Sequence, residues 1–236
     1  MQPILRNLTI AFFLLTIMDL IAIISGVPLL QFIAKPLLIP VLMLLLYIIP
    51  YKNGSKKLLL FALLFSWLGD VFLLAESCDP HFFIAGLGCF LTTHICYILF
   101  FLCMDAPERS LLLKQPLWLF LILAYGLALI WLLFPRLGGL TFPVILYAAV
   151  ICTMLLCSLH AYTKSKRPAN LYYVIGAAAF VVSDSILAVN KFYRPFKIAG
   201  VLIMLMYCAA QYCIVRGFME QVKKGEDQSV HVYKDL

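Results

Sequence analysis

Long apolar runs alternate with short polar joints along almost the whole chain. Each run has about the 20 residues that an α-helix needs to cross the hydrocarbon layer of a membrane. We predict eight membrane helices, over residues 8–24, 29–49, 56–75, 81–104, 114–134, 141–162, 170–190 and 198–218. The pattern therefore predicts an all-α, polytopic membrane bundle. One transmembrane domain spans residues 1–218, and a flexible cytoplasmic tail follows over residues 219–236.

The composition agrees with a membrane protein. Of the 236 residues, 64% are hydrophobic and 12% are charged, and the mean hydropathy is +1.03. Soluble domains have roughly 45–50% apolar residues. The formal net charge of +7 does not indicate nucleic-acid binding, because the basic residues lie at the ends of the predicted helices and not in a patch with aromatic residues.

The distribution of basic residues predicts the orientation in the membrane. With eight helices both termini share one side, and thirteen Lys and Arg residues fall on that side against four on the other. Cytoplasmic loops carry the excess of Lys and Arg. We therefore place both termini in the cytoplasm, and expect the inner membrane of a bacterial cell or the endoplasmic reticulum of a eukaryotic one.

Two aspartates stand in otherwise apolar helices, Asp70 in FSWLGDVFLLA and Asp184 in FVVSDSILAVNKF. Each follows a small residue and precedes a leucine by three positions. Ionisable groups in hydrocarbon are costly, so by default they face the protein interior and mark a functional site. Both lie at nearly equal depth in helices that run in the same direction. We therefore expect the two carboxylates to converge on one cavity, and the repeated motif suggests two parallel four-helix halves.

Other polar residues within the predicted helices leave alternatives open. Lys35, directly before Pro36, either joins the acidic site or extends its side chain to the membrane surface. His94 has Tyr97 one turn later, and it is either a site residue or a core histidine that bonds a neighbouring helix. Asp19, near the outer end of the first helix, is explained by snorkelling or capping as well as by function.

Five further residues complete the candidate set. Tyr147 could reach the site as a hydrogen-bond donor, and Asn190 lies at the same depth. Tyr207 and Gln211 form an i, i+4 pair that could equally serve as interhelical hydrogen bonds. Lys191 is seven residues after Asp184 on the same helical face. It is either a contact for a substrate headgroup or an anchor at the membrane surface.

Paired carboxylates beside a lysine can hold one proton between them near neutral pH, which suits general acid and general base catalysis. Such a pair fits the hydrolysis of acetals and enol ethers, in which a cation stabilised by oxygen develops. The membrane favours a substrate with a long alkyl chain, and Lys35 and Lys191 favour a phosphate headgroup. We expect no cofactor, and no metal because His94 and His160 fall at opposite depths.

Taken together, the motifs resemble those of the YhhN-like lysoplasmalogenase family over essentially the whole chain. They are Lys35-Pro36, Gly69-Asp70, the Phe83/Gly86/Phe90/His94/Tyr97 series, Ser183-Asp184 with Leu187-Ala188, Asn190-Lys191-Phe192, and Tyr207 with Ala210-Gln211. The resemblance implies hydrolysis of the vinyl ether bond of lysoplasmalogens, which carry ethanolamine or choline, to a fatty aldehyde and a glycerophospho-amine. It also implies that Asp70 and Asp184 are the catalytic pair.

The alternative is a proton-coupled lipid transporter or flippase that performs no covalent chemistry. Parallel repeats and intramembrane Asp and Lys residues also suit alternating access. Under either hypothesis the partners are a lysophospholipid and the lipid bilayer, with no nucleic acid. A homodimer is left open.

Overall fold

The computed structural model describes residues 2–51, 54–104, 111–163 and 168–234. Its elements are α1 (Gln2–Ser25), α2 (Pro28–Ile48), α3 (Gly54–Leu74), α4 (His81–Leu102), α5 (Leu111–Lys114), α6 (Leu117–Leu137), the 3₁₀ turn η1 (Gly138–Leu140), α7 (Thr141–Ala161), α8 (Ala169–Ala188), the π-helical η2 (Val189–Tyr193) and α9 (Ala199–Lys234). These ranges contain no strand, so the all-α prediction is confirmed.

Seven segments of the described chain are long and apolar enough to cross a membrane. One of them, Leu117–Ala161, has 45 residues and comprises α6, η1 and α7. Two of the predicted spans, 114–134 and 141–162, coincide largely with this one apolar segment. The seven segments make the chain a multi-pass membrane protein.

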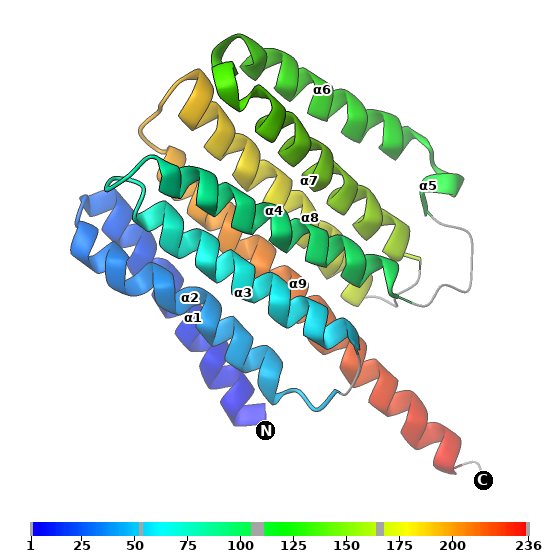
Figure 1. The fold of residues 1–236 in the computed structure, drawn as a ribbon. Helices are drawn as coiled ribbons and strands as arrows, with labels where there is room; N and C mark the ends of the chain where they lie inside the picture. Colours follow the sequence, from blue (N-terminus) through cyan, green and yellow to red (C-terminus); the bar gives the residue numbers. More distant parts are fainter. Residues whose placement is uncertain (1, 52–53, 105–110, 164–167, 235–236) are drawn as a thin grey trace.

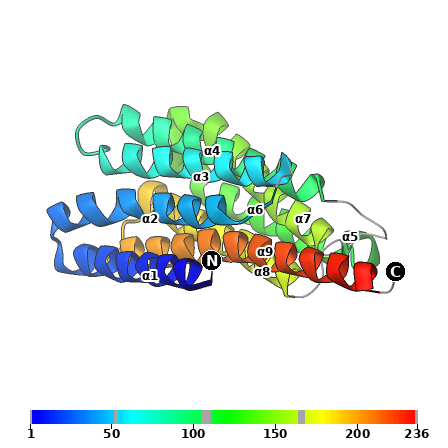
Figure 2. The ribbon, with the colours of Figure 1, turned by 90° about the horizontal axis from the view of Figure 1, so that it is seen from below.

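Consecutive helices pack as antiparallel pairs, and the most extensive contacts join α8 with α9, α3 with α4, and α1 with α2 (Figure 1). Helix α9 also contacts α1 and α2, while α4 contacts α7. Seen from below, α3 and α4 lie on one side of the bundle, and α1, α8 and α9 on the other (Figure 2). Helix α1 begins and α9 ends at the same end of the bundle. The flexibility of the tail over residues 219–236 stays a prediction, because the side chains from 224 onward lie outside the described part.

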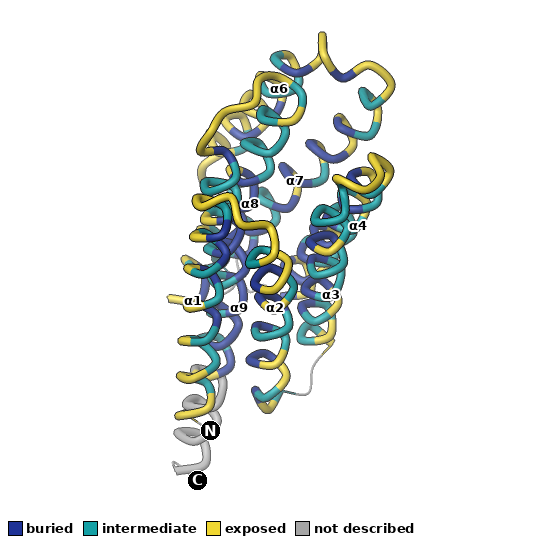
Figure 3. The backbone as a smooth tube through the Cα atoms, turned by 90° about the vertical axis from the view of Figure 1, so that its left-hand side faces the viewer, coloured by how far each residue is buried: buried dark blue, intermediate teal, exposed yellow. Residues whose placement is uncertain are grey.

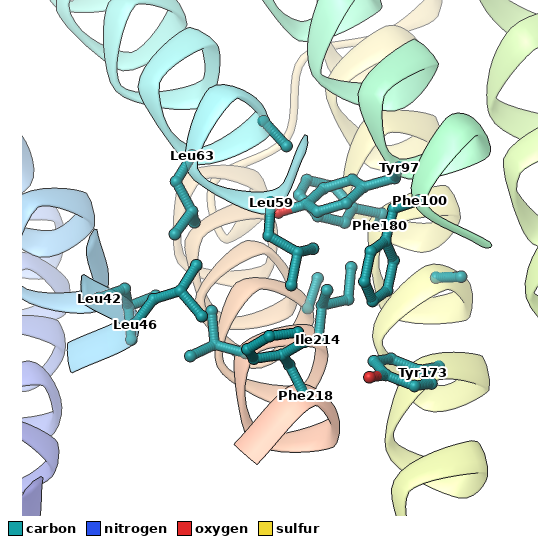
Figure 4. Close-up of a cluster of buried hydrophobic side chains, with 14 of the residues drawn as sticks. Leu42, Leu46, Leu59, Leu63, Tyr97, Phe100, Tyr173, Phe180, Ile214 and Phe218 are labelled. Carbon is teal, nitrogen blue, oxygen red and sulfur yellow. The ribbon is translucent and has the colours of Figure 1, made fainter. Parts of the chain in front are cut away.

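Large apolar side chains from α2, α3, α4, α8 and α9 meet in the centre of the bundle (Figure 4). Leu42, Leu63, Phe180 and Phe218 are almost completely buried there. The outward-facing positions are apolar as well, with Trp131 80% exposed, and the exposed residues follow the outer sides of the helices (Figure 3). A bundle that is apolar on both its inside and its outside suits hydrocarbon as its solvent.

Helix α2 has two prolines in its interior, Pro36 and Pro40, and α3 donates a hydrogen bond to the carbonyl oxygen that Pro40 leaves without one. Pro40 has no N–H to donate to the carbonyl oxygen of Pro36, as the residue four positions later in a helix normally does. The indole Nε1 of Trp67 donates to that oxygen instead, over 2.9 Å. This bond holds α3 against α2 one residue after Lys35 and one turn before Asp70.

Gly176 lets α8 and α9 approach closely. A Cβ atom there would lie 2.7 Å from Ile214 Cγ1 and 3.0 Å from the carbonyl oxygen of Ala210. We expect Gly176→Ala to lower the free energy of unfolding by about 1–3 kcal/mol, as overpacking does. Gly88→Ala in α4 is the matched control, because a Cβ there meets nothing within 4 Å. Thermal unfolding in detergent measures both, and equal effects would contradict the close-packing argument.

Candidate functional site

Asp184 lies one turn before the end of α8, and side chains from two other helices meet its carboxylate. The hydroxyl of Tyr147, in α7, donates a hydrogen bond to Asp184 Oδ2 over 2.5 Å. Nε2 of His94, in α4, lies 3.0 Å from the same oxygen and 3.0 Å from the Tyr147 hydroxyl. Tyr147 is a hydrogen-bond donor to Asp184, as predicted, while the contacts of His94 fit both a site residue and a core histidine that bonds neighbouring helices. We call these three residues the Asp184 centre.

The hydrogen bonds of the Asp184 centre differentiate the two carboxylate oxygens. Among the described residues, Oδ2 receives both contacts and Oδ1 receives none. His94 is completely buried, and its Nδ1 has no hydrogen-bond partner within the described chain. An Nε2–H tautomer satisfies these contacts, since a second N–H at Nδ1 would be buried without an acceptor. The centre therefore leaves one carboxylate oxygen available for chemistry.

Asp184 lines two small cavities. One, of about 40 Å³, lies among α6, α7 and α8, and also reaches Tyr125 and Ser185. The other, of about 30 Å³, lies among α4, α7, α8 and η2. One water molecule needs a cavity with roughly 10–15 Å³ of space for its centre. Each cavity therefore has room for water beside Asp184, but not for a lipid.

Asp70 lies in α3 and forms a second centre with residues from α2 and α9. The hydroxyl of Tyr207 donates to Asp70 Oδ2 over 2.6 Å. Nζ of Lys35 lies 3.7 Å from Asp70 Oδ1. Asp70 is 2% exposed and Lys35 is 8% exposed, so Lys35 does not extend to the membrane surface. These three residues, the Asp70 centre, are a buried ion pair with an added hydrogen-bond donor.

The two centres are separate in this structure. The contacts between them run through aromatic rings: Tyr207 packs edge-to-face on Phe180, whose ring contacts His94 with a centroid distance of 5.2 Å. No hydrogen bond or ion pair between described residues joins the two centres. Asp70 lines neither of the cavities that Asp184 lines. We expected both carboxylates to line one cavity. Of the two, Asp184 alone lines these cavities, so they do not confirm that expectation.

Tyr97 and Gln211 belong to a third polar group, which holds helices together. The Tyr97 hydroxyl donates to Gln211 Oε1 over 2.6 Å, and Gln211 Nε2 donates to Ser66 Oγ over 2.8 Å. Ser66 in turn donates to the hydroxyl of Thr93. The chain of bonds connects α3, α4 and α9 with each member fully buried. Of the two interpretations of Gln211, interhelical hydrogen bonding is the one that this geometry supports.

Lys191 and Asn190 lie in η2, outside both centres. Lys191 forms an ion pair with Glu76, which follows α3, and its Nζ lies 4.6 Å from the centre of the Phe83 ring. The side-chain oxygen of Asn190 accepts a hydrogen bond from the backbone N–H of Phe196. Because η2 is a π-helix, the α-helical spacing that put Lys191 on the face of Asp184 does not apply there.

Asp19 is the polar residue whose burial the sequence did not indicate. It has no exposed surface, and neither carboxylate oxygen has a hydrogen-bond partner in the described chain. Snorkelling and capping are both wrong for a side chain in this position. A buried carboxyl without a hydrogen-bond partner costs stability, and attraction to the Lys35 charge offsets part of that cost.

We expect Asp19→Leu to raise the free energy of unfolding by about 1–3 kcal/mol, because an apolar side chain removes that cost. Thermal unfolding in detergent measures the change. Asp79→Leu, in the exposed connection between α3 and α4, is the comparison and should instead lower the stability, because Asp79 Oδ1 accepts a hydrogen bond from the backbone N–H of His81. A lower stability for Asp19→Leu would indicate that the attraction between Asp19 and Lys35 outweighs the cost of burying the carboxyl.

No group of three His, Cys, Asp or Glu side chains in the described ranges could hold a metal ion. The groups that the two centres themselves supply are carboxyl, imidazole, phenol and ammonium.

The sequence is similar to those of known proteins. A model of the YhhN family matches residues 30–218. A protein named lysoplasmalogenase from Mycobacterium bovis is 33% identical over 173 residues, which cover 70% of this chain. The chain spans 61% of the length of that relative. Lysoplasmalogenase TMEM86A of Bos taurus is 30% identical over 199 residues, covering 80% of this chain and 79% of the relative. No solved structure matches.

Proposed function

The chain belongs to the YhhN family, and we propose that it is a membrane hydrolase that cleaves the vinyl ether bond of lysoplasmalogens. The products are a fatty aldehyde and a glycerophospho-amine with ethanolamine or choline. The names of the mycobacterial and bovine relatives support this substrate. The observation that carries the proposal is the Asp184 carboxylate, which is bonded by His94 and Tyr147 and lies beside cavities with room for water.

The chemistry of a vinyl ether matches the groups present. Cleavage begins when an acid protonates the alkenyl carbon that is not bonded to oxygen, and the carbon bonded to oxygen becomes part of an oxocarbenium ion. Water then adds to that ion, and the resulting hemiacetal breaks into an aldehyde and an alcohol. Proton transfer by positioned side chains contributes about 10²–10⁴-fold to such reactions. A lipid substrate reaches the centres from the bilayer, in which they already lie.

Asp184 is the acid in this proposal, because its Oδ1 accepts no hydrogen bond within the described chain and is available to deliver a proton. Asp70 is the base, and Lys35 and Tyr207 support its carboxylate form. Asp184 gives its proton to carbon, and Asp70 takes a proton from the attacking water. In the last step Asp184 recovers a proton from the hemiacetal hydroxyl, and Asp70 returns one to the departing glycerol oxygen. Both groups end as they began.

A substrate between the two carboxylates requires the rings that separate them to move. Phe180 lies between Tyr207 and His94, and the cavities beside Asp184 are too small for an alkenyl chain. The bound alkenyl chain displaces Phe180 in this proposal. Aromatic faces next to the reacting carbon then stabilise the oxocarbenium ion, as they do other cations.

We also propose that the chain crosses the membrane eight times, with both termini in the cytoplasm. At 1.5 Å per residue a straight 45-residue helix would be about 68 Å long, roughly twice the hydrocarbon thickness. Helices α6 and α7 instead fold back on each other at η1 (Figure 1). Arg6 and Lys223 lie at the end where α1 begins, which favours that end as cytoplasmic. The two parallel halves, and the inner membrane or the endoplasmic reticulum as the location, belong to the same proposal.

The test uses purified protein in liposomes with lysoplasmenyl-ethanolamine, and mass spectrometry of the lipids and aldehydes. The proposal expects release of one fatty aldehyde per glycerophosphoethanolamine, and no reaction with the acyl analogue, which has an ester in place of the vinyl ether. Movement of intact lipid between the leaflets without aldehyde release would support the transporter instead. Light scattering of the detergent-solubilised protein tests the homodimer.

A further inference from the structure

Another cavity, larger than the two beside Asp184, lies between α1 and α9, at the end of the bundle where α1 begins. Its volume is about 540 Å³, and its lining residues include Arg6, Thr9, Tyr212, Arg216 and Lys223. We call it the α1–α9 cavity. Ser183, next to Asp184, donates a hydrogen bond to Ile203 of α9. Arg216 follows Ile203 by 13 residues, which is roughly 20 Å along the helix. The α1–α9 cavity is therefore remote from the Asp184 centre, and Asp70, Lys35 and Tyr207 are not among its lining residues.

The charge of this cavity is positive. Three of its lining side chains are cationic, Arg6 from α1 and Arg216 and Lys223 from α9. Glu220 offsets one of these charges, since its carboxylate lies 2.6 Å from Arg216 and 3.6 Å from Lys223. Two positive charges remain. The first turn of α1 contains no acidic residue, so the positive end of its helix dipole adds to the attraction for an anion.

The position of the cavity along the bundle corresponds to the headgroup layer. The candidate spans Gln2–Ser25 and Ala199–Lys223 begin and end at residues that line it. Leu5, Ile10 and Met219 line its apolar part. A cavity with cations at the membrane surface and apolar residues toward the hydrocarbon fits a phospholipid better than a soluble anion. Basic residues that serve only as membrane anchors have no need of a shared cavity between two helices.

We propose that the α1–α9 cavity binds the phosphate headgroup of an anionic phospholipid from the surrounding bilayer. Arg6 and Arg216 bind the phosphate from opposite helices, and the acyl chains begin along Leu5 and Ile10. The lipid therefore clamps α1 onto α9. This inference does not depend on the proposed hydrolysis, because phosphatidylglycerol has no vinyl ether.

The experiment compares thermal unfolding of the purified full-length protein with phosphatidylglycerol, with phosphatidylcholine, and with inorganic phosphate at the same concentration. Phosphatidylglycerol should raise the unfolding temperature by roughly 5 °C more than phosphatidylcholine does, through binding to the folded state. Native mass spectrometry should show one retained phosphatidylglycerol molecule. An equal shift with inorganic phosphate would overturn the lipid and indicate a free-anion site.

Charge-neutralising variants locate the effect. We expect the single variant Arg6→Gln and the double variant Arg6→Gln with Arg216→Gln to lose most of the additional rise in unfolding temperature that phosphatidylglycerol gives. In phosphatidylcholine both variants should unfold at the wild-type temperature. Arg194→Gln with Lys197→Gln is the matched control, because it removes two exposed positive charges near the opposite end of α9. It should keep the shift. Loss of the shift in the control, or its retention in both Arg6 variants, would overturn the proposed site.

Discussion

Asp184→Asn should lower the turnover number for aldehyde release by roughly 10³-fold, within the range that positioned acids and bases contribute. The amide keeps the shape of the carboxylate, and its oxygen can still accept hydrogen bonds from Tyr147 and His94. It cannot deliver a proton to carbon or take one back. The Michaelis constant should change little, because Asp184 acts on the reacting carbon and not on the headgroup. Quantitative mass spectrometry of the aldehyde measures both constants.

Asp79→Asn is the matched control for this loss of charge. Asp79 lies outside the membrane spans with an exposed side chain, and its Oδ1 accepts a hydrogen bond from the backbone N–H of His81 over 2.8 Å. That bond and the His81 side chain hold the pKa of Asp79 below its ordinary value. Its replacement should leave aldehyde release within a factor of about two. Wild-type turnover in Asp184→Asn would refute the assignment of Asp184 as the acid.

The sequence predicted the candidate residues better than their grouping. Polar side chains in apolar helices are conspicuous, so Asp70, Asp184, Lys35 and His94 could be recognised from their surroundings alone. Depth could also be counted along each helix. The choice of neighbouring helices could not, because it depends on packing between segments distant in sequence. As a result Asp184 was expected beside Asp70, whereas its contacts are with His94 and Tyr147.

Two further differences have local causes. Asp19 is near a helix end in the sequence, which made a surface position plausible, but α9 packs against that end of α1, where Gly200 lies next to Ile23. Lys191 was placed by α-helical spacing, and the π-helix η2 changes that spacing. The long helices themselves were predictable within a few residues, since apolar length is set by the membrane.

The ion pair between Lys35 and Asp70 has the largest expected effect on stability. Asp70→Asn removes the carboxylate that lies 3.7 Å from the buried Lys35 ammonium, and Lys35→Met removes the counter-charge of the Asp70 carboxylate. Each single variant should lower the free energy of unfolding by about 3–5 kcal/mol, as breaking a buried pair does. The double variant has no buried charge at either position, so most of that loss should be recovered. Thermal and denaturant unfolding in detergent measure the three variants, with Lys197→Met as the exposed control.

The double variant also separates folding from catalysis. Its stability should approach that of the wild type, yet aldehyde release should stay at least about a hundredfold below it, because the amide that replaces the Asp70 carboxylate has no basic oxygen to take a proton from water. If the double variant were both stable and fully active, Asp70 would have a structural role only and Asp184 would act without it. If the single losses were additive in the double variant, Lys35 and Asp70 would not be energetically coupled. Recovered stability with absent turnover is therefore the one outcome that makes Asp70 a member of the catalytic pair.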